Sequence, residues 1–137
     1  MICGVHGFIG AALGKLLNNK RQAFWAGVMS HFIADMLPHR DMSVPVEAAL
    51  AVTSLTAIGV TQGVGSPAFY GALGAMLPDA ENAYTQTTGR GRNFFPTHNG
   101  LHGAKIKELA PQVGLVLLSV GILLAVDFCA NAPDRPE

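Results

Sequence analysis

Charged residues are scarce in this sequence. Only 13% of its 137 residues are Asp, Glu, Lys or Arg, about half the share that is usual for a soluble domain. Nine basic side chains balance nine acidic ones, so the formal net charge is zero. Proteins that bind nucleic acid through a basic surface carry an excess of positive charge. The composition therefore excludes nucleic acid as a non-specific partner of this chain.

Cysteine pairs and runs of β-branched residues are also missing. Cys3 and Cys129 lie at opposite ends without a C-x-x-C partner, which excludes a disulfide framework and a cysteine zinc site. Glycine occurs sixteen times, half of all residues are apolar, and the mean hydropathy is +0.34. This balance favours closely packed helices over a sheet. We predict an all-α fold, a small membrane-associated bundle of about five to six helices over residues 1–130 with a metal site at helix ends. A disordered tail, 131–137, should follow.

Proline and glycine set the expected helix bounds. Pro38 and Pro78 should each end a helix, because proline disfavours the helical conformation of the residue before it. Gly10 and Gly14 form a G-x-x-x-G pair that allows close contact between helices. Other prolines fall where helices begin, at first positions that lack a hydrogen-bond partner anyway. The expected helices are 1–17, 22–37, 45–60, 67–77, 98–109 and one that starts at Pro111.

The last of these helices is the strongest candidate for crossing a membrane. Residues 113–126 carry no charge, and counting on to Ala130 gives the ~20 residues that a bilayer crossing needs. The helix 45–60 is the next candidate. Under the positive-inside rule we expect two basic groups to face the cytoplasm together. These groups are Lys15 with Lys20 and Arg21, and Lys105 with Lys107.

The segment 30–41 carries the densest potential chemistry. His31 and Asp35 lie one helical turn apart and point the same way, a spacing that can chelate a divalent metal. His39 and Asp41 lie just past the expected helix end and can fold back toward the same place. The alternative interpretation is a buried hydrogen bond between His31 and Asp35, without a metal.

Two further clusters repeat this pattern. Asp79 and Glu81 follow Pro78, which would put two carboxylates on a tight polar turn; the alternative is a pair of ordinary loop acids. His98 and His102 are four residues apart, so a helix would present both imidazoles on one face. The alternative there is a solvated amphipathic helix. His6 lies in an apolar neighbourhood, where an unpaired imidazole is costly.

Histidines and acids thus fall at helix ends in four places, and a small bundle can bring such groups to one interior site. We expect His6, His31, Asp35, Asp79 and His102 to approach one another, with His98 and Glu81 near them. Histidine and carboxylate ligands suit zinc, manganese or iron. A metal with an open position lowers the pKa of bound water and creates a nucleophile near neutral pH.

The order of these motifs resembles a family of bacterial proteins, the LexA-binding, inner-membrane-associated metal-dependent hydrolases, which are distantly similar to zinc-dependent phospholipase C. The resemblance covers roughly residues 5–126. It is carried by His6, His31-x-x-x-Asp35, Leu77-Pro78-Asp79-x-Glu81 and His98-x-Gly100-x-His102-Gly103. Two positions depart from the family pattern: Glu81 stands where a second Asp is usual, and Asn99 replaces an Arg. The resemblance implies a divalent metal, most readily zinc, and an inner-membrane location.

The first hypothesis for function is a membrane-bound metal-dependent hydrolase of a phosphoester such as a phospholipid. Asp35 or Glu81 would act as general base, and Arg90 and Arg92 would hold the phosphate. The alternative for these arginines is a juxtamembrane basic loop. The second hypothesis is a non-catalytic membrane protein with a structural metal, which would have four protein ligands and no open position, or with a regulator-binding role. A transporter or channel is disfavoured, because its ionisable residues would line a path at mid-membrane.

Overall fold

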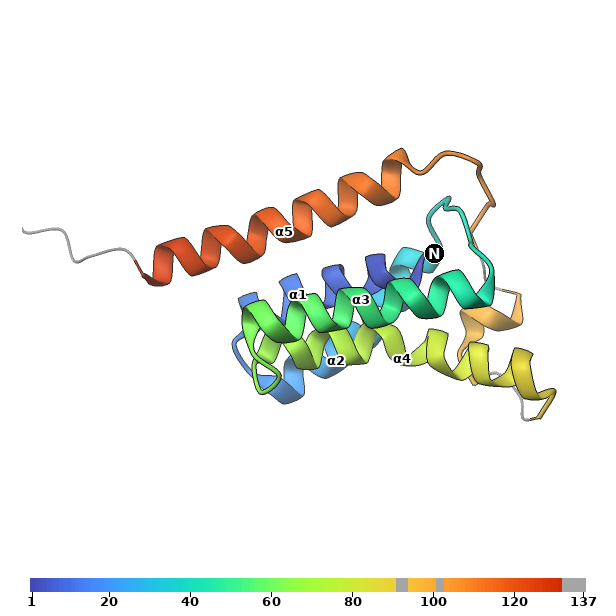
Figure 1. Cartoon of the computed structure of the whole chain (residues 1–137), viewed down its shortest axis with the longest axis horizontal. Helices are drawn as coiled ribbons and strands as arrows, with labels where there is room; N and C mark the ends of the chain where they lie inside the picture. The colour runs from blue at the N-terminus through green and yellow to red at the C-terminus, as the bar shows by residue number, and fades with distance from the viewer. Residues whose placement is uncertain (91–93, 101–102, 132–137) are drawn as a thin grey trace, which may run out of the picture.

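The computed structural model of the chain describes residues 1–90, 94–100 and 103–131, and within them the regular structure is helical apart from one isolated β-bridge. The predicted all-α class is confirmed. The elements, drawn in Figure 1, are α1 (Cys3–Leu17), α2 (Lys20–Asp35), α3 (Val44–Gln62), α4 (Pro67–Thr88), the 3-10 helix η1 (Pro96–Asn99) and α5 (Ala110–Ala130).

Helices α1, α2 and α4 form the close-packed centre of the bundle. A Cβ added to Gly10 would overlap the carbonyl oxygen of Gly71, and one on Gly14 would overlap that of Pro67. The backbones of α1 and α4 therefore touch directly, which confirms the close contact predicted from the G-x-x-x-G pair. Gly74 of α4 meets the backbone of Phe24 on α2 in the same way. Side chains larger than hydrogen at these positions would push the three helices apart.

The helices alternate in direction, so that α1, α3 and α5 begin at the end of the bundle where α2 finishes (Figure 1). We call this the site end. Lys105 and Lys107 precede α5 and lie at the site end, whereas Lys15 contacts Asp127, near the last turn of α5. The expectation that both basic groups face the same side is therefore wrong. The reason is the parallel alignment of α1 and α5, which puts the end of one and the start of the other at opposite ends.

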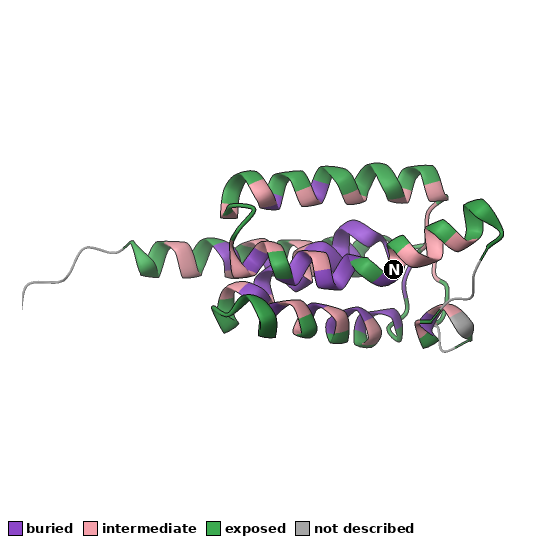
Figure 2. Cartoon of the chain, turned by 90° about the horizontal axis from the view of Figure 1, so that it is seen from below, coloured by how far each residue is buried: buried purple, intermediate pink, exposed green. Residues whose placement is uncertain are grey.

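Helices α3 and α5 lie on the outside of the bundle and expose most of their apolar side chains (Figure 2). Val60 on α3 is 80% exposed and Phe128 on α5 is 77% exposed, while Ser54 and Ser119 are buried. Both helices are long and apolar enough to cross a membrane, the two that were predicted. Polar residues inside and apolar residues outside are the arrangement that a lipid environment favours.

Helix α5 is fastened to the bundle near both of its ends. At the site end, the Gln112 side chain accepts from the backbone N–H of Ile2 at 3.0 Å and donates to the Arg40 carbonyl at 3.2 Å. At the far end, Asp127 pairs with Lys15 and accepts from Gln62 Nε2 at 3.0 Å. These contacts fix where α5 begins relative to the predicted site residues.

The ends of α4 and α2 differ from the sequence prediction. Helix α4 continues through Pro78 to Thr88, so Asp79 and Glu81 lie on a helix and not on a tight turn. An interior proline removes one backbone hydrogen bond and costs about 3 kcal/mol, which the packing of the preceding turns against α1 and α2 outweighs. The helix ends instead at Gly89, whose left-handed φ of 65° supplies the C-cap. Helix α2 ends at Asp35, two residues before the predicted bound of 37.

The prediction of a helix over 98–109 is wrong for the part of this range that the structure describes. Only the short turn η1 forms there, and Gly100 ends it with φ of 115°. Residues 103–106 run extended beside the segment that follows α2: Gly103 N donates to Asp35 O at 2.8 Å, and Ile106 N donates to His39 O at 3.0 Å. The backbone of residues 103–106 thus finds its partners across the chain, not within a helix. The tail from 132 and His102 lie outside the described residues.

Candidate metal centre

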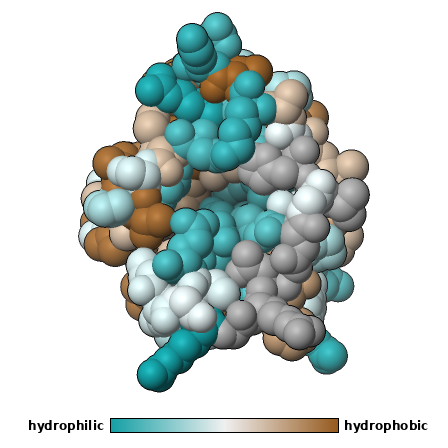
Figure 3. All heavy atoms as spheres, turned by 90° about the vertical axis from the view of Figure 1, so that its right-hand side faces the viewer, coloured by the Kyte–Doolittle hydropathy of each residue, from teal (hydrophilic) through white to brown (hydrophobic). Residues whose placement is uncertain are grey.

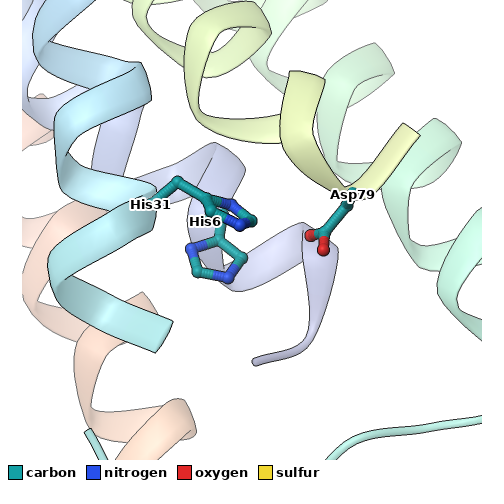
Figure 4. Close-up of side chains that lie close together, drawn as sticks. All are labelled: His6, His31 and Asp79. Atoms are coloured by element: carbon teal, nitrogen blue, oxygen red, sulfur yellow. The ribbon is translucent and has the colours of Figure 1, made fainter. Parts of the chain in front are cut away.

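Five of the predicted site residues meet at the site end from four different elements. His6 comes from α1, His31 and Asp35 from α2, Asp79 from α4 and His98 from η1. Figure 4 shows the imidazoles of His6 and His31 stacked side by side, with the Asp79 carboxylate facing them. The ring centroids of this pair of histidines are 4.0 Å apart.

His31 presents a single free nitrogen to this cluster. Its Nδ1 lies 2.9 Å from the carbonyl oxygen of Ala75, and since a carbonyl only accepts, Nδ1 carries the hydrogen. Its Nε2 then offers a lone pair, 3.2 Å from Asp35 Oδ2. Two lone pairs facing each other do not form a hydrogen bond. The geometry disfavours the alternative of a simple His31–Asp35 hydrogen bond for a neutral imidazole.

The turn of α4 before Pro78 holds His31 in place. Pro78 has no N–H to donate to the Gly74 carbonyl of that turn, and the neighbouring Ala75 carbonyl accepts from His31. Pro78, which was expected to end the helix, instead follows the turn of α4 whose Ala75 carbonyl binds the His31 imidazole.

Asp35 lies at the middle of the cluster. Its Oδ1 accepts from the Met1 nitrogen at 2.8 Å and lies 3.0 Å from His6 Nε2. Its Oδ2 lies 3.2 Å from His31 Nε2 and 3.7 Å from His98 Nε2. The backbone bond from Gly103 to the Asp35 carbonyl fixes the end of α2 on which this carboxylate sits.

His98 connects Asp35 to Asp79. Its Nε2 is 3.5 Å from Asp79 Oδ1. Two sets of three potential ligand atoms lie within 4.8 Å of one another: His6 with His31 and Asp79, and His31 with Asp35 and His98. Because His31 belongs to both sets and has one lone pair to give, a single ion is all that it can bind.

Buried polar atoms without a hydrogen-bond partner gather here. In the described part of the chain seven side-chain atoms are in this state, and six of them belong to predicted site residues. An unpaired buried polar group costs about 1–3 kcal/mol, so a cluster of them indicates a missing partner. The seven atoms are His6 Nδ1, His31 Nε2, Asp35 Oδ2, Asp79 Oδ2, Glu81 Oε2, Thr97 Oγ1 and His98 Nδ1.

Three separations between potential ligand atoms are close to those of a tetrahedral cation site. Zinc binds imidazole nitrogen and carboxylate oxygen at about 2.0–2.2 Å, which puts neighbouring tetrahedral ligands about 3.3–3.6 Å apart. The separations of 3.2, 3.7 and 3.5 Å around Asp35, His31, His98 and Asp79 cluster about these values. The residues present therefore fit a divalent metal without a large rearrangement.

The protonation states also suit a metal. Burial lowers the pKa of His6 to about 4, so this imidazole is neutral at pH 7. Burial alone would raise the pKa of Asp35, but the imidazoles of His31 and His6 outweigh it and lower the pKa. The pKa of Asp79 is lowered by His98 against the same effect of burial. Metal ligands must be deprotonated, and these three groups are.

Glu81 and Arg90 contribute no atom to the two sets of potential ligands. Glu81 Oε1 accepts from the backbone N–H of Phe94 at 2.7 Å, and Glu81 belongs to neither set of ligand atoms. Arg90 follows the end of α4, roughly 16 Å further along the helix direction than Asp79. Arg92 and His102 lie outside the described residues. The structure thus brings together His6, His31, Asp35, Asp79 and His98, but not Glu81 or Arg90.

His39 also belongs to neither set of potential ligand atoms. It is fully buried, its Nδ1 donates to the Leu37 carbonyl at 2.7 Å, and its Nε2 lies 3.0 Å from Asp41. Asp41 in turn pairs with Lys105 at 3.0 Å. These contacts anchor the loop between α2 and α3 to residues 103–106.

Cys3 is a neighbour of the cluster that sequence reasoning missed. It is buried, and burial together with the nearby Asp79 carboxylate raises the pKa of its thiol. Cys3 and His6 are one helical turn apart on α1, and this spacing was the available signal. Cys3 has no C-x-x-C partner, so a cysteine motif does not reveal it.

The cluster opens on a cavity of about 590 Å³ between α3 and α4, and Asp79 and His98 are among its lining residues. Seen from the site end, hydrophilic side chains surround a central hollow and apolar ones lie on the flanks (Figure 3). A pocket of this volume falls within the ~300–1,000 Å³ that small-molecule sites occupy.

No protein-family model matches the chain, and no curated protein or solved structure matches it either. The resemblance to inner-membrane hydrolases therefore remains a prediction from the motifs.

Proposed function

We propose that the site end binds one divalent metal ion, with zinc the best match to the ligand types. The observation that carries this proposal is the set of six buried, partnerless atoms on predicted site residues. His31, Asp35 and His98 form one set of three potential ligand atoms, Asp79 lies 3.5 Å from His98, and His6 supports Asp35 from its other oxygen. A supporting hydrogen bond of this kind orients a ligand carboxylate.

We further propose that the site hydrolyses a phosphoester. A bound zinc supplies a water of lowered pKa. Within the chain, Asp35 is engaged with three imidazoles and acts as a ligand, whereas Glu81 keeps one buried oxygen without a partner and is the candidate general base. Asp79 and His98 line a cavity of substrate size, which favours an open, catalytic site over a closed structural one.

We place this activity at a membrane, in agreement with the resemblance to inner-membrane hydrolases. Two outer helices, α3 and α5, have the length and hydropathy of membrane spans and expose their apolar faces. The site end is where both helices begin, so the proposed metal would lie near one membrane surface. A phospholipid is the phosphoester present there in quantity.

Metal content tests the first part of the proposal. Purified wild-type protein should contain about one zinc per chain, and His98→Ala should lose most of it. His39→Ala is the control, because His39 is a buried histidine at the same end of the bundle but outside both ligand sets. Wild-type protein that stays metal-free after exposure to zinc, manganese and iron would refute metal binding.

Hydrolysis of a chromogenic phosphodiester in detergent, with metal content measured on the same sample, tests the second part. The expected result is turnover that requires both the metal and His98. A fully loaded protein that cleaves none of a broad panel of phosphoesters would favour the non-catalytic, structural role.

A further inference from the structure

The cavity beside the proposed metal site has two chemically different ends. Along α3 it extends from Val44 to Leu55, and along α4 it reaches back to Leu73. Asp79, His98 and Lys105 lie at the site end. The whole cavity covers roughly 16 Å of α3. Its part toward the far end, about 6 Å of α3, is lined by Ala51, Val52, Leu55, Leu73, Met76 and Leu77.

This cavity exists because α3 packs against α4 differently from the central helices. Glycines let α1, α2 and α4 touch backbone to backbone, whereas α3 faces the cavity with Ala48 and Ala51, whose small side chains leave the space open. The apolar part of the cavity is open to the surface of the protein. Two of its lining residues are partly exposed, Val52 by 67% and Leu77 by 46%.

We infer that the cavity holds the acyl chain of a membrane lipid whose phosphoester lies at the polar end, so that the substrate class is a phospholipid bound by one chain. This inference rests on the proposed function and names its substrate. One cavity wall is α3, which has the length and hydropathy of a membrane span, so an acyl chain can enter sideways from the bilayer. The polar end matches the headgroup, since Lys105 places an ammonium group there, shared with Asp41.

We identify the occupant by matching the polar and apolar ends of the cavity to the two ends of an amphiphilic molecule. A water-soluble phosphoester would leave the apolar residues from Ala51 to Leu77 unused, and a plain hydrocarbon would use neither the proposed metal beside Asp79 and His98 nor the Lys105 ammonium group. An apolar chain attached to a phosphate uses both ends at once. Burial of the chain gains roughly 0.8 kcal/mol for each methylene group.

A photoreactive lysophospholipid with a diazirine at the end of its single acyl chain tests the inference. The full chain is labelled in lipid nanodiscs, and the cross-linked peptides are mapped by mass spectrometry. We expect adducts on α3 and α4 around Ala51–Leu55 and Leu73–Leu77. Adducts spread evenly over the exposed face of α5 would mean ordinary lipid contact and would overturn the inference.

Two matched variants sharpen this test. Ala51→Trp fills the cavity and should reduce labelling by about tenfold. Ala49→Trp makes the same change on the same helix outside the cavity lining and should label like wild type. Equal labelling of the two folded variants would overturn the inference. If Ala51→Trp does not fold, the adduct map of the wild type decides the question by itself.

The result is separable from that of the proposed function. Labelling needs no metal, so chelated protein should give the same adducts. Metal-dependent cleavage of a small soluble phosphodiester, without labelling of the cavity, would leave the hydrolase proposal intact and overturn the lipid inference. Cavity labelling without cleavage of any phosphoester would make the lipid a ligand and overturn its role as substrate.

Discussion

At the scale of single residues, Asp35 shows why buried polar atoms carry functional information. Its carboxylate is fully buried, and both of its oxygens face imidazole nitrogens. A buried ion is unfavourable unless it is paired and hydrogen-bonded. A neutral His31 cannot supply the missing hydrogen bond, because its one ring hydrogen is on Nδ1 and is donated to the Ala75 carbonyl. A cation between these groups resolves the conflict.

Replacement of this carboxylate gives a test at the same scale. Asp35→Asn keeps the shape of the side chain but removes its negative charge. If Asp35 is a ligand, metal occupancy and hydrolysis should fall together, by more than the ~10–100-fold loss that is usual for a supporting residue. Metal titration and turnover on the same sample measure both quantities. Loss of turnover with full metal occupancy would instead identify Asp35 as the general base.

At the scale of elements, α4 combines two features that work against a regular helix. Pro78 interrupts the hydrogen-bond ladder, and Gly71 and Gly74 have low helix propensity. Both features lie where the site is positioned: the glycines bring α4 close to α1 and α2, and the turn before Pro78 supplies the Ala75 carbonyl for His31.

Pro78→Ala separates helix stability from site geometry. Alanine restores an N–H that can bond within α4, so the thermal unfolding midpoint in detergent should stay equal or rise. The restored N–H would bond to the Gly74 carbonyl and straighten the turn that also carries the Ala75 carbonyl, so we expect zinc affinity to fall by about tenfold. Pro67→Ala, at the first position of the same helix, should change neither quantity. Unchanged zinc affinity in Pro78→Ala would show that the proline has no role in placing His31.

Gly71→Ala tests the contact between α1 and α4. The new Cβ would overlap the Gly10 carbonyl, and the expected loss is about 1–3 kcal/mol in the free energy of unfolding. Gly121→Ala on α5 is the control, because a Cβ there meets nothing within 4 Å. It should be neutral or stabilising by up to ~1 kcal/mol through helix propensity. Similar stability of the two variants would contradict the close packing of α1 on α4.

At the scale of the whole molecule, the distribution of apolar surface suggests a lipid environment. The two helices with the length and hydropathy of membrane spans, α3 and α5, are the outer ones, and their buried residues include Ser54, Ser119 and Gln112. We predict that the chain sediments with membranes, resists alkaline carbonate extraction and needs detergent to remain dispersed. Replacing Leu117 and Leu124, both exposed on α5, by Asp should lower membrane recovery, whereas Thr87→Asp on α4 should not. Recovery of the wild type as a soluble monomer without detergent would contradict this prediction.

The sequence alone determined the features that depend on local spacing and composition. The helical class, the apolar span ending near Ala130 and the His31–Asp35 spacing all follow from periodicity within a few turns. Sequence reasoning also selected His6, Asp79 and His98, because ionisable groups are rare in so apolar a chain and must find partners once buried.

Only the tertiary structure decided where those groups meet. The path of α4 through Pro78 depends on its packing against α1 and α2, which outweighs the local effect of proline. Residues 103–106 are extended because their backbone bonds reach across to Asp35 and His39. The free nitrogen of His31 is defined by the Ala75 carbonyl, 44 residues away, and the cavity by the spacing of α3 from α4. Long-range contacts of this kind leave no periodic signal in the sequence.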